Sequence, residues 1–486
     1  MKLRHLLALS VIAAMMAIAT GTASAQTITY RAGPFHVGGF QTKLPKLQVR
    51  APHMDGYITK MNATLHYANG RRVTIRKVML HHIVFLNDGS PNNEPGGSCK
   101  GRKGEPFYGT GEEREQLLLP SGYGYRVRAH DRWRMQTMLM SHSFQARNVY
   151  VQYTFTITKK RMTPVRPFWI RANGCVTTQP SYSVQTLSSG LDHRTFHWTV
   201  PMNGRIVAAG GHLHGGAEHM SLTQPGCKDR KLLDTDPLFG PRNDLVYRIR
   251  PILHEPGPVG TRFFQSKTGI PVRKGEKIDL QADYNANYAR ARVMSIMHVY
   301  VAEGPAPKGP LCAPLPRDAR EILLRSDGHL SDPPYVKIPF NAVGDDGKVR
   351  PLANLPGPAT PFDGPAQVQV IHNQFKPAKI EIPLNGSITW TFADSVGHNV
   401  LLANGPQVVG SPTLSGGAKY TSRGFLKPGD YQFFCYLHPV TMHQEVIVED
   451  PADDAVGTIQ PPQAAARAAA ADTGSGELPK NADFGW

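Results

Sequence analysis

The chain has 486 residues, among them 47 glycines and 41 prolines, and a formal net charge of +17. This length is too great for one ordinary domain, and many turn residues with few long helical periodicities predict an all-β chain of two or three domains. The basic surface would attract acidic partners, but basic motifs interleaved with aromatic residues are lacking, so nucleic-acid binding is not expected.

The first 25 residues have the pattern of a secretory signal peptide. A basic start with Lys2 and Arg4 precedes an apolar stretch from Leu6 to Ile18, and Ala23-Ser24-Ala25 is a small-residue cleavage site. The apolar stretch is too short for a comfortable membrane span, and no later stretch is long and apolar enough to be one. We therefore expect a periplasmic or secreted chain without a membrane span.

The body that follows, residues 26–303, has the composition of β-strands and turns. Alternation of apolar and polar residues is clearest at 149–157, and turn residues such as Asn87-Asp88-Gly89 separate the strands. The predicted strands are Val73-Thr74-Ile75, Ile83-Val84-Phe85-Leu86, 149–157 and His298-Val299-Tyr300-Val301.

Three further segments follow the body. Residues 304–364 are rich in Pro, Ala and Gly, which predicts a linker in which only Glu321-Ile322-Leu323-Leu324 indicates a short helix. Residues 365–450 have strand composition again and are expected to form a separate domain. Residues 451–486 include an Ala-rich run and are predicted to be a disordered tail.

The chain has five cysteines: Cys99, Cys175, Cys227, Cys312 and Cys435. If Cys435 binds a metal, an even number remains, and an exported protein folds in an oxidising compartment. Two disulfides are therefore expected, and the three possible pairings stay open.

A set of metal-binding side chains lies in residues 365–450. His398, Cys435, His438 and Met442 supply two imidazoles, a thiolate and a thioether, which together hold copper in blue electron-transfer sites. Strand-like runs at 431–434 and 444–448 flank the loop that carries three of these residues. His443 is an alternative to Met442, and a buried Cys with surface histidines and no metal is the alternative to the whole site.

Residues 367–449 resemble the cupredoxins, the plastocyanin and amicyanin family. Members of that family carry His-Asn-Val on one strand and Cys-x-x-His followed by Met on the last loop, as do His398-Asn399-Val400 and Cys435 to Met442 here. Met442 comes one residue later than in the amicyanin-type loop. The resemblance implies a Greek-key β-sandwich with one type 1 copper.

Two pairs of histidines stand out in the body. His212 and His214 are two residues apart, so on a strand they project from the same face, and the flanking glycines allow other segments to come close. His81 and His82 are adjacent, and adjacent residues on a flat strand point to opposite faces. The second pair would bind one ion only at a twist or a bulge.

The order His81-His82, His142, His212-x-His214 and Met294 resembles the copper type II, ascorbate-dependent monooxygenases, and also plant nodulin-related, stress-upregulated secreted proteins. The resemblance implies two β-sandwich subdomains, 26–175 and 176–303, and up to two further mononuclear copper sites. His81, His82 and His142 would store an electron. His212, His214 and Met294 would bind oxygen, because a thioether favours Cu(I).

Some positions depart from that family or remain open. Gly210 stands where peptide-hydroxylating members have an arginine that holds a substrate carboxylate, so a peptidylglycine substrate is not expected. Met297 is an alternative to Met294, and His254 has no predicted role. The expected function is that of a secreted multicopper redox protein, monooxygenase-like, with an unknown substrate and with a redox partner or small-molecule reductant. A non-catalytic copper-binding electron-transfer protein is the alternative.

Overall fold

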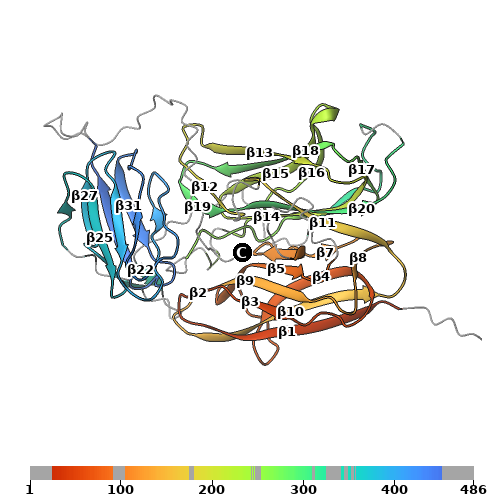
Figure 1. The fold of residues 1–486 in the computed structure, drawn as a ribbon, viewed down its shortest axis with the longest axis horizontal. Helices are drawn as coiled ribbons and strands as arrows, with labels where there is room; N and C mark the ends of the chain where they lie inside the picture. The colour runs from red at the N-terminus through yellow and green to blue at the C-terminus, as the bar shows by residue number, and fades with distance from the viewer. Residues whose placement is uncertain are drawn as a thin grey trace, which may run out of the picture.

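The computed structural model describes residues 24–90, 104–174, 180–241, 244, 246, 253–308, 312–323, 341–343, 349–351, 355 and 357–450. Within these ranges the chain is all-β, as predicted, with strands β1 to β32 and the short 3-10 turn η1 (Pro225–Cys227). Two sandwiches of the body lie against each other, and a C-terminal sandwich lies beside both (Figure 1). The same ranges contain no helix of the length and apolarity that crossing a membrane requires.

The first sandwich consists of two sheets that enclose a core around Phe85, Phe107, Trp133 and Tyr153. Its strands β4 and β10 alternate between buried and half-buried residues, as strands with one covered face do. One sheet contains, in order, β1 (Gln26–Val37), β10 (Arg147–Thr158), β4 (Gly56–His66) and β8 (Tyr123–Val127), with β7 (Leu117–Leu118) beside β4; the other contains β2 (Thr42–Lys43), β3 (Lys46–Val49), β9 (Trp133–Ser141), β5 (Val78–Asn87) and β6 (Glu105–Gly111).

The second sandwich continues the first sheet of the first one. Strands β8 and β11 pair in parallel and join the two halves into one ten-stranded sheet, so the second sandwich takes its first strand from before residue 175. After β8 this sheet runs β11 (Thr163–Arg171), β20 (Ser295–Glu303), β14 (Gly204–Leu213), β17 (Arg262–Val272) and β21 (Arg320–Leu323); it faces β13 (Leu191–Thr199), β18 (Lys277–Asn285), β15 (Ala217–Gln224) and β16 (Arg230–Asp234), with β12 (Tyr182–Val184) paired to β19 (Arg290–Val293).

Strand β5 is buried along its whole length, because the second sandwich covers its outer face. Val78, Leu80, Ile83 and Phe85 point into the first core. The side chains of Met79, Val84 and Leu86 instead belong to clusters on the opposite side, where Val84 and Leu86 meet Trp169 and Ile296 of the second sandwich. The residues of β5 that point into the first core have even numbers up to 80 and odd numbers from 83 onward. This change occurs where the pairing of β5 with β9 shifts register, between Leu80 and His82. This bulge lies at the histidine pair.

Two predictions of local structure were wrong. The predicted strand at 73–75 is a turn, in which the Thr74 carbonyl accepts hydrogen bonds from Lys77 and Val78. The predicted helix around Glu321 is strand β21, which pairs with the edge strand β17. A run of a few apolar residues cannot distinguish a helical turn from an edge strand.

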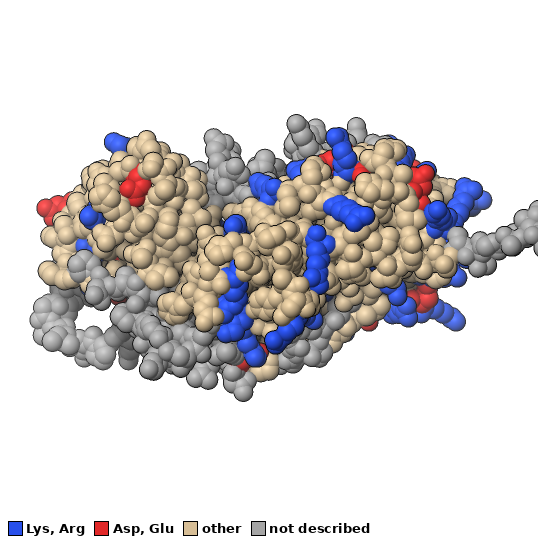
Figure 2. Space-filling model, turned by 90° about the horizontal axis from the view of Figure 1, so that it is seen from below, with Lys and Arg blue, Asp and Glu red and all other residues tan. Residues whose placement is uncertain are grey.

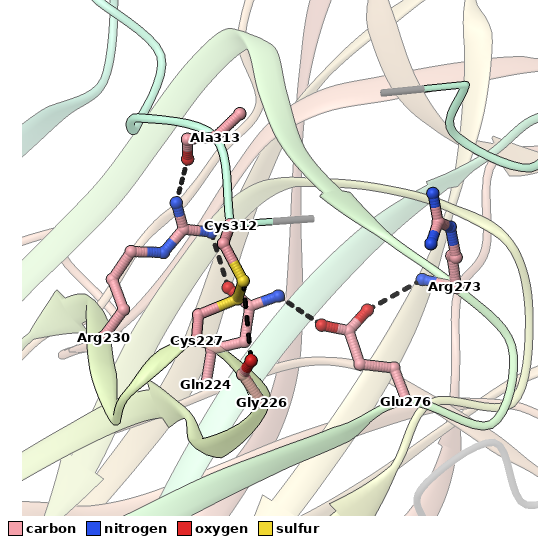
Figure 3. The surroundings of a disulfide bond; sticks show 8 residues. All are labelled: Gln224, Gly226, Cys227, Arg230, Arg273, Glu276, Cys312 and Ala313. Carbon is pink, nitrogen blue, oxygen red and sulfur yellow. Dashed lines mark hydrogen bonds between the residues drawn. A yellow bond between two sulfur atoms is a disulfide. The ribbon is translucent and has the colours of Figure 1, made fainter. Parts of the chain in front are cut away.

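A disulfide between Cys227 and Cys312 fastens the start of the predicted linker to the second sandwich (Figure 3). Arg230 supports this attachment by donating to the carbonyl oxygen of Ala313 and to Oε1 of Gln224. The segment at 312–323 is therefore packed on the body. Cys99 and Cys175, residues 1–23 of the predicted signal peptide at 1–25, and the predicted tail at 451–486 lie outside the described residues.

The C-terminal sandwich has two sheets of mixed pairing around Trp390, Phe392 and Phe433. Lys and Arg are scattered over the face of the molecule that Figure 2 shows, more on the body than on this sandwich. One sheet contains β24 (Thr360–Pro361), β27 (Lys379–Ile382), β32 (His443–Val448), β31 (Gly429–Phe434) and β29 (Leu401–Asn404); the other contains β26 (Gln374–Lys376), β25 (Ala366–Ile371), β28 (Ile388–Phe392) and β30 (Ala418–Thr421), and a separate hairpin, β22 (Asn341–Val343) and β23 (Val349–Pro351), precedes both.

Candidate metal centres

Three side chains with ligand atoms meet at one end of the C-terminal sandwich. Cys435 directly follows β31, His438 lies in the turn before β32, and His398 precedes β29. The Nδ1 atoms of His398 and His438 are 3.1 Å apart, and Cys435 Sγ lies 3.7 Å from His438 Nδ1. One ligand atom of each residue lies within 4.8 Å of the other two.

These distances fit three ligands of one metal ion. A metal ion such as zinc lies about 2.0–2.1 Å from an imidazole nitrogen and about 2.3 Å from a thiolate, so two ligands of one ion are roughly 3–4 Å apart. His398 Nε2 is 2.9 Å from the Asp394 carboxylate and must carry its proton there, so Nδ1 directs a bare lone pair at His438. Two imidazoles and a thiolate form the donor set of a blue copper site.

Two residues that sequence reasoning missed hold this centre in place. Asp394 orients the ring of His398 and itself accepts backbone hydrogen bonds from residues 372 and 373, which hold its pKa below the usual range. Asn399 ties the two ligand segments together, because its backbone N–H lies 3.4 Å from Cys435 Sγ and its Oδ1 accepts from the Tyr436 amide at 3.2 Å. The position of Asp394, four residues before His398, was a usable signal.

Met442 and His443 occupy different environments. Met442 is fully buried in the same core as Cys435, and the Cys435 amide donates to the Met442 carbonyl. His443 Nε2 lies 2.8 Å from the carbonyl oxygen of Pro439, so this nitrogen is a donor and has no lone pair for a metal. The hydrogen bond to Pro439 occupies one ring nitrogen of His443, and Met442 as the fourth ligand stays a prediction.

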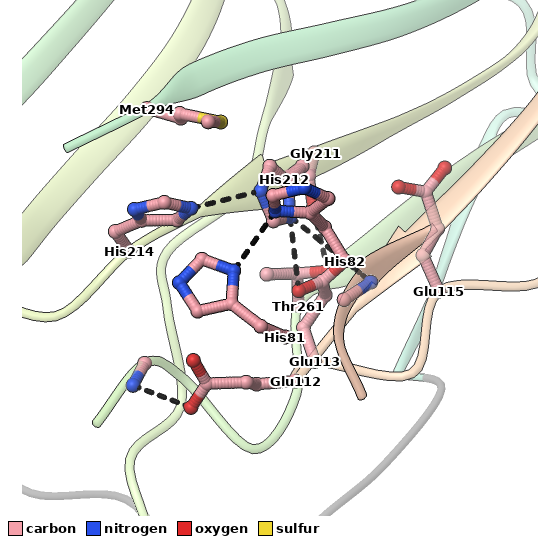
Figure 4. A network of polar contacts seen from close by, with 12 residues as sticks. His81, His82, Glu112, Glu113, Glu115, Gly211, His212, His214, Thr261 and Met294 are labelled. Carbon is pink, nitrogen blue, oxygen red and sulfur yellow. Dashed lines mark hydrogen bonds and ion pairs between the residues drawn. The ribbon is translucent and has the colours of Figure 1, made fainter. Parts of the chain in front are cut away.

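Four body histidines, His81, His82, His212 and His214, gather between the two sandwiches (Figure 4). We call them the histidine cluster. All are at least nine-tenths buried. The Nδ1 atoms of His81 and His82 are 2.9 Å apart, and the Nε2 atoms of His212 and His214 are 3.2 Å apart. The resemblance implied separate sites for the two pairs, whereas packing brings all four side chains into one region.

The bulge in β5 explains how adjacent histidines meet. An extra residue at the bulge sends both His81 and His82 out of the first core toward the second sandwich. On β14, Leu213 points into the second core, so His212 and His214 face the first sandwich. The expectation that the adjacent pair requires a bulge is confirmed.

Glycines at the cluster leave room for its neighbours. A Cβ on Gly111 would lie 2.7 Å from Cε1 of His212 and 2.6 Å from the His81 carbonyl. On β14, a side chain on Gly210 would collide with Glu115, and one on Gly211 would lie 2.5 Å from Met220. The predicted close approach at the glycines beside His212 is therefore found.

An acidic loop after β6 contacts the cluster, and sequence reasoning missed it. Both oxygens of Glu113 lie 3.2 Å from His212 Nδ1, and Glu115 lies 2.8 Å from His298 Nδ1. Burial raises the pKa of Glu112 to about 8 and raises the pKa of Glu115. The sequence did offer a signal for this loop, namely three glutamates within four residues of an otherwise basic chain.

The protonation of the cluster fits a bound cation. His212 Nδ1 donates to Glu113, and His214 Nδ1 donates to the Arg292 carbonyl at 2.9 Å. The facing Nε2 atoms therefore carry lone pairs that point at each other. Burial also lowers the pKa values of His81, His82 and His214 well below the usual range, so these rings are neutral and suited to metal ligation.

The structure groups the predicted ligands differently from the implied two sites. His81, His82 and His214 each offer one ligand atom within 4.8 Å of the others, so residues of the two implied sites meet. His142 is buried, with its pKa lowered to about 4, and lies near His254. Met294 lines the cavity beside His214, whereas Met297 packs into the second core.

A cavity of about 120 Å³ lies between the cluster and the C-terminal sandwich. His81, His82, His214 and Met294 line it from the body, together with apolar residues such as Met138 and Leu253. From the C-terminal sandwich it is lined by residues 401–403, 434 and 436. The histidine cluster therefore borders a cavity at the interface with the C-terminal sandwich, next to residues that adjoin the ligand Cys435 in the chain.

The C-terminal sandwich is similar in sequence to known copper proteins. Residues 366–449 match the family described as copper binding proteins, plastocyanin/azurin family. Amicyanin-alpha of Methylorubrum extorquens is 32% identical over 89 residues, which are 18% of this chain and 73% of that protein.

Two solved structures are also similar. A methionine-to-glutamine mutant of amicyanin in the Cu(I) form has 20% identity and a TM-score of 0.17, over 19% of this chain and 95% of its own. The purple cupredoxin from Nitrosopumilus maritimus has 28% identity and a TM-score of 0.16, over 17% of this chain and 99% of its own.

Proposed function

Because the chain belongs, through residues 366–449, to the plastocyanin/azurin family of copper-binding proteins, we propose that its C-terminal sandwich exchanges electrons with a copper held by the histidine cluster. Copper bound at His398, Cys435, His438 and Met442 would supply one-electron chemistry. The chain's own residues bind it, exclude water and connect it to the body.

One continuous series of contacts carries this proposal. Tyr436 follows the ligand Cys435 in the chain, and the guanidinium carbon of Arg292 lies 4.7 Å from the centre of the Tyr436 ring. The carbonyl oxygen of the same Arg292 accepts the hydrogen bond from His214 Nδ1. The route from Cys435 to His214 therefore has two covalent segments, one ring contact and one hydrogen bond.

The docking of the sandwiches supports this route. Ala289 and Ala291, next to Arg292, pack on the core of the C-terminal sandwich. Polar contacts fix the same interface, because the Val408 amide donates to Gln185 and the Lys427 ammonium donates to the Thr186 carbonyl. Because contacts lie on both sides of the route, they hold the two centres in a fixed position relative to each other.

The route is tested by replacing Arg292 with methionine. This substitution keeps an unbranched apolar stem in place of the first part of the arginine side chain and removes the guanidinium group that covers the Tyr436 ring. We expect electron transfer from the reduced C-terminal centre to the cluster to slow at least tenfold, on the order of 1.4 kcal/mol in activation free energy. Pulse radiolysis would measure it, as the rate at which the blue absorption returns after reduction.

Tyr436→Phe is the matched control, because it keeps the ring that the guanidinium covers and removes only the hydroxyl and its hydrogen bond to Arg292. It should leave the rate within about twofold of wild type. Equal rates in Arg292→Met and wild type, with unchanged copper content and blue absorption, would exclude the Arg292 route.

Monooxygenase activity is a second candidate function, favoured by the cavity that His81, His82, His214 and Met294 share. This cavity gives a small substrate room beside the cluster. Oxygen uptake by the wild-type protein that depends on both a reductant and a substrate would favour this function. If no such oxygen uptake is measured, electron exchange is the one of the two candidate functions that remains.

We also propose that the protein acts in the periplasm or outside the cell, with a redox protein or small-molecule reductant as partner. The signal-peptide pattern at 1–25 and the even number of cysteines besides Cys435 support this location.

A further inference from the structure

Three side chains with lone-pair donor atoms converge beside the histidine cluster, His254, Met79 and Glu112. His254 Nε2 lies 3.0 Å from Met79 Sδ and 3.3 Å from Glu112 Oε1. His81, Glu112 and His254 each offer one ligand atom, and these atoms lie within 4.8 Å of one another. Met79 lies two residues before His81 on the outer face of β5.

The hydrogen bonds of His254 determine which of its nitrogens is bare. His254 Nδ1 lies 2.5 Å from the carbonyl oxygen of Glu255, which can only accept, so Nδ1 carries the proton. In the neutral ring, Nε2 then has only its lone pair. A thioether sulfur is likewise an acceptor, so no proton lies between Nε2 and Met79 Sδ.

Glu112 is oriented toward the same point. Its Oε2 accepts the amide hydrogen of Gly257 at 2.7 Å, which leaves Oε1 on the side of His254. The Glu112 side chain is 4% exposed, and an ionised carboxylate at this depth requires a compensating cation. Sulfur and oxygen donor atoms thus both lie close to the bare nitrogen of His254.

From this convergence we infer that His254, Met79, Glu112 and His81 form a further copper site next to the histidine cluster. Ligands of one first-row metal ion are roughly 3–4 Å apart, and Met79 Sδ and Glu112 Oε1 each lie within this range of His254 Nε2. Imidazole with thioether is a soft donor set that suits Cu(I), and the carboxylate also accommodates the divalent state.

His81 places this further site beside the site that the histidine cluster would form. Its Nδ1 is directed at His82, and Figure 4 shows the ring between the other labelled histidines and Glu112, with its two nitrogens on different sides. One imidazole can therefore contact both positions. The His254 side chain is 18% exposed and lines the cavity, which gives an ion access.

A proton on Glu112 is the competing occupant. Protonated Glu112 could donate to His254 Nε2 without any metal. Their separation of 3.3 Å is long for a hydrogen bond from a carboxylic acid. A proton there also leaves the 3.0 Å approach of Met79 Sδ to the same nitrogen unexplained.

The test counts copper in the full-length protein. Metal-free wild type and His254→Gln would be titrated with Cu(I) under anaerobic conditions against a chromophoric chelator, with total copper measured by mass spectrometry. We expect wild type to bind one more copper per chain than His254→Gln. In Met79→Leu, Cu(I) binding at this position should weaken at least tenfold, while Zn(II) binding changes less.

His197→Gln is the matched control, because that histidine is 68% exposed on β13 and should lose no copper. Unchanged blue absorption and circular dichroism would establish that each variant is folded. Equal copper in His254→Gln and wild type would overturn the site, and so would an unchanged Cu(I) affinity in Met79→Leu. The inference does not depend on electron exchange with the C-terminal sandwich, which the Arg292 variant tests separately.

Discussion

Replacing Asn399 with alanine tests how the blue centre is held together. The Asn399 side chain is fully buried, and its Oδ1 is the acceptor for the buried Tyr436 amide at 3.2 Å. Its Nδ2 makes a longer contact, 3.4 Å, with the hydroxyl of Thr413. The backbone amide of residue 399, which faces Cys435 Sγ, remains in the variant.

The expected loss of stability follows from these contacts. A buried N–H left without an acceptor costs about 1–3 kcal/mol, and Thr413 is half-buried, so its hydroxyl can turn to water. We therefore expect the C-terminal sandwich to lose about 2 kcal/mol, which raises its unfolding equilibrium constant about 30-fold. The wavelength of the blue absorption should stay the same, because the three ligands are retained.

Denaturant titration followed by the blue absorption reports on this sandwich alone. Asn399→Ala should unfold at a clearly lower midpoint than wild type. Thr413→Val removes only the second contact and should cost less than about 0.5 kcal/mol. The reasoning is refuted if Asn399→Ala is no less stable than Thr413→Val.

Two further outcomes are expected. Cys435→Ser should abolish the strong visible absorption and leave copper at the histidine cluster, as electron paramagnetic resonance would detect; colour that survives the substitution would exclude Cys435 as the thiolate ligand. The metal-free protein should lose stability as the pH falls from about 6.5 to 4. Burial lowers the pKa values of His142 and His254 to about 4 and about 3, so the unfolded chain binds more protons in that range. The raised pKa values of four buried glutamates act in the opposite sense, those of Glu105, Glu112, Glu115 and Glu255. The lowered pKa values of four further histidines add to the loss, those of His81, His82, His214 and His443. Thermal unfolding at several pH values measures this, and a melting temperature that rises on acidification would contradict it.

The local sequence pattern was sufficient to predict a strand where the pattern repeats over a continuous stretch of the chain. Strand β10 covers its predicted range because its alternation persists over nine residues. The short run at 73–75 had no such length, and there a turn formed instead. Periodicity becomes decisive only when it repeats several times.

The sequence by itself determined the all-β class and the ligand types of the C-terminal centre, because Cys435 and His438 lie within one turn and the loop between two strands holds them together. Only the tertiary structure decided the composition of the body sites. Met79 and His254 are 175 residues apart, and Glu113 and His212 are 99 apart. Such pairs meet because the two sandwiches pack together and because β5 has a bulge at His81. Neither the packing nor the bulge can be predicted from the spacing of nearby residues in the sequence.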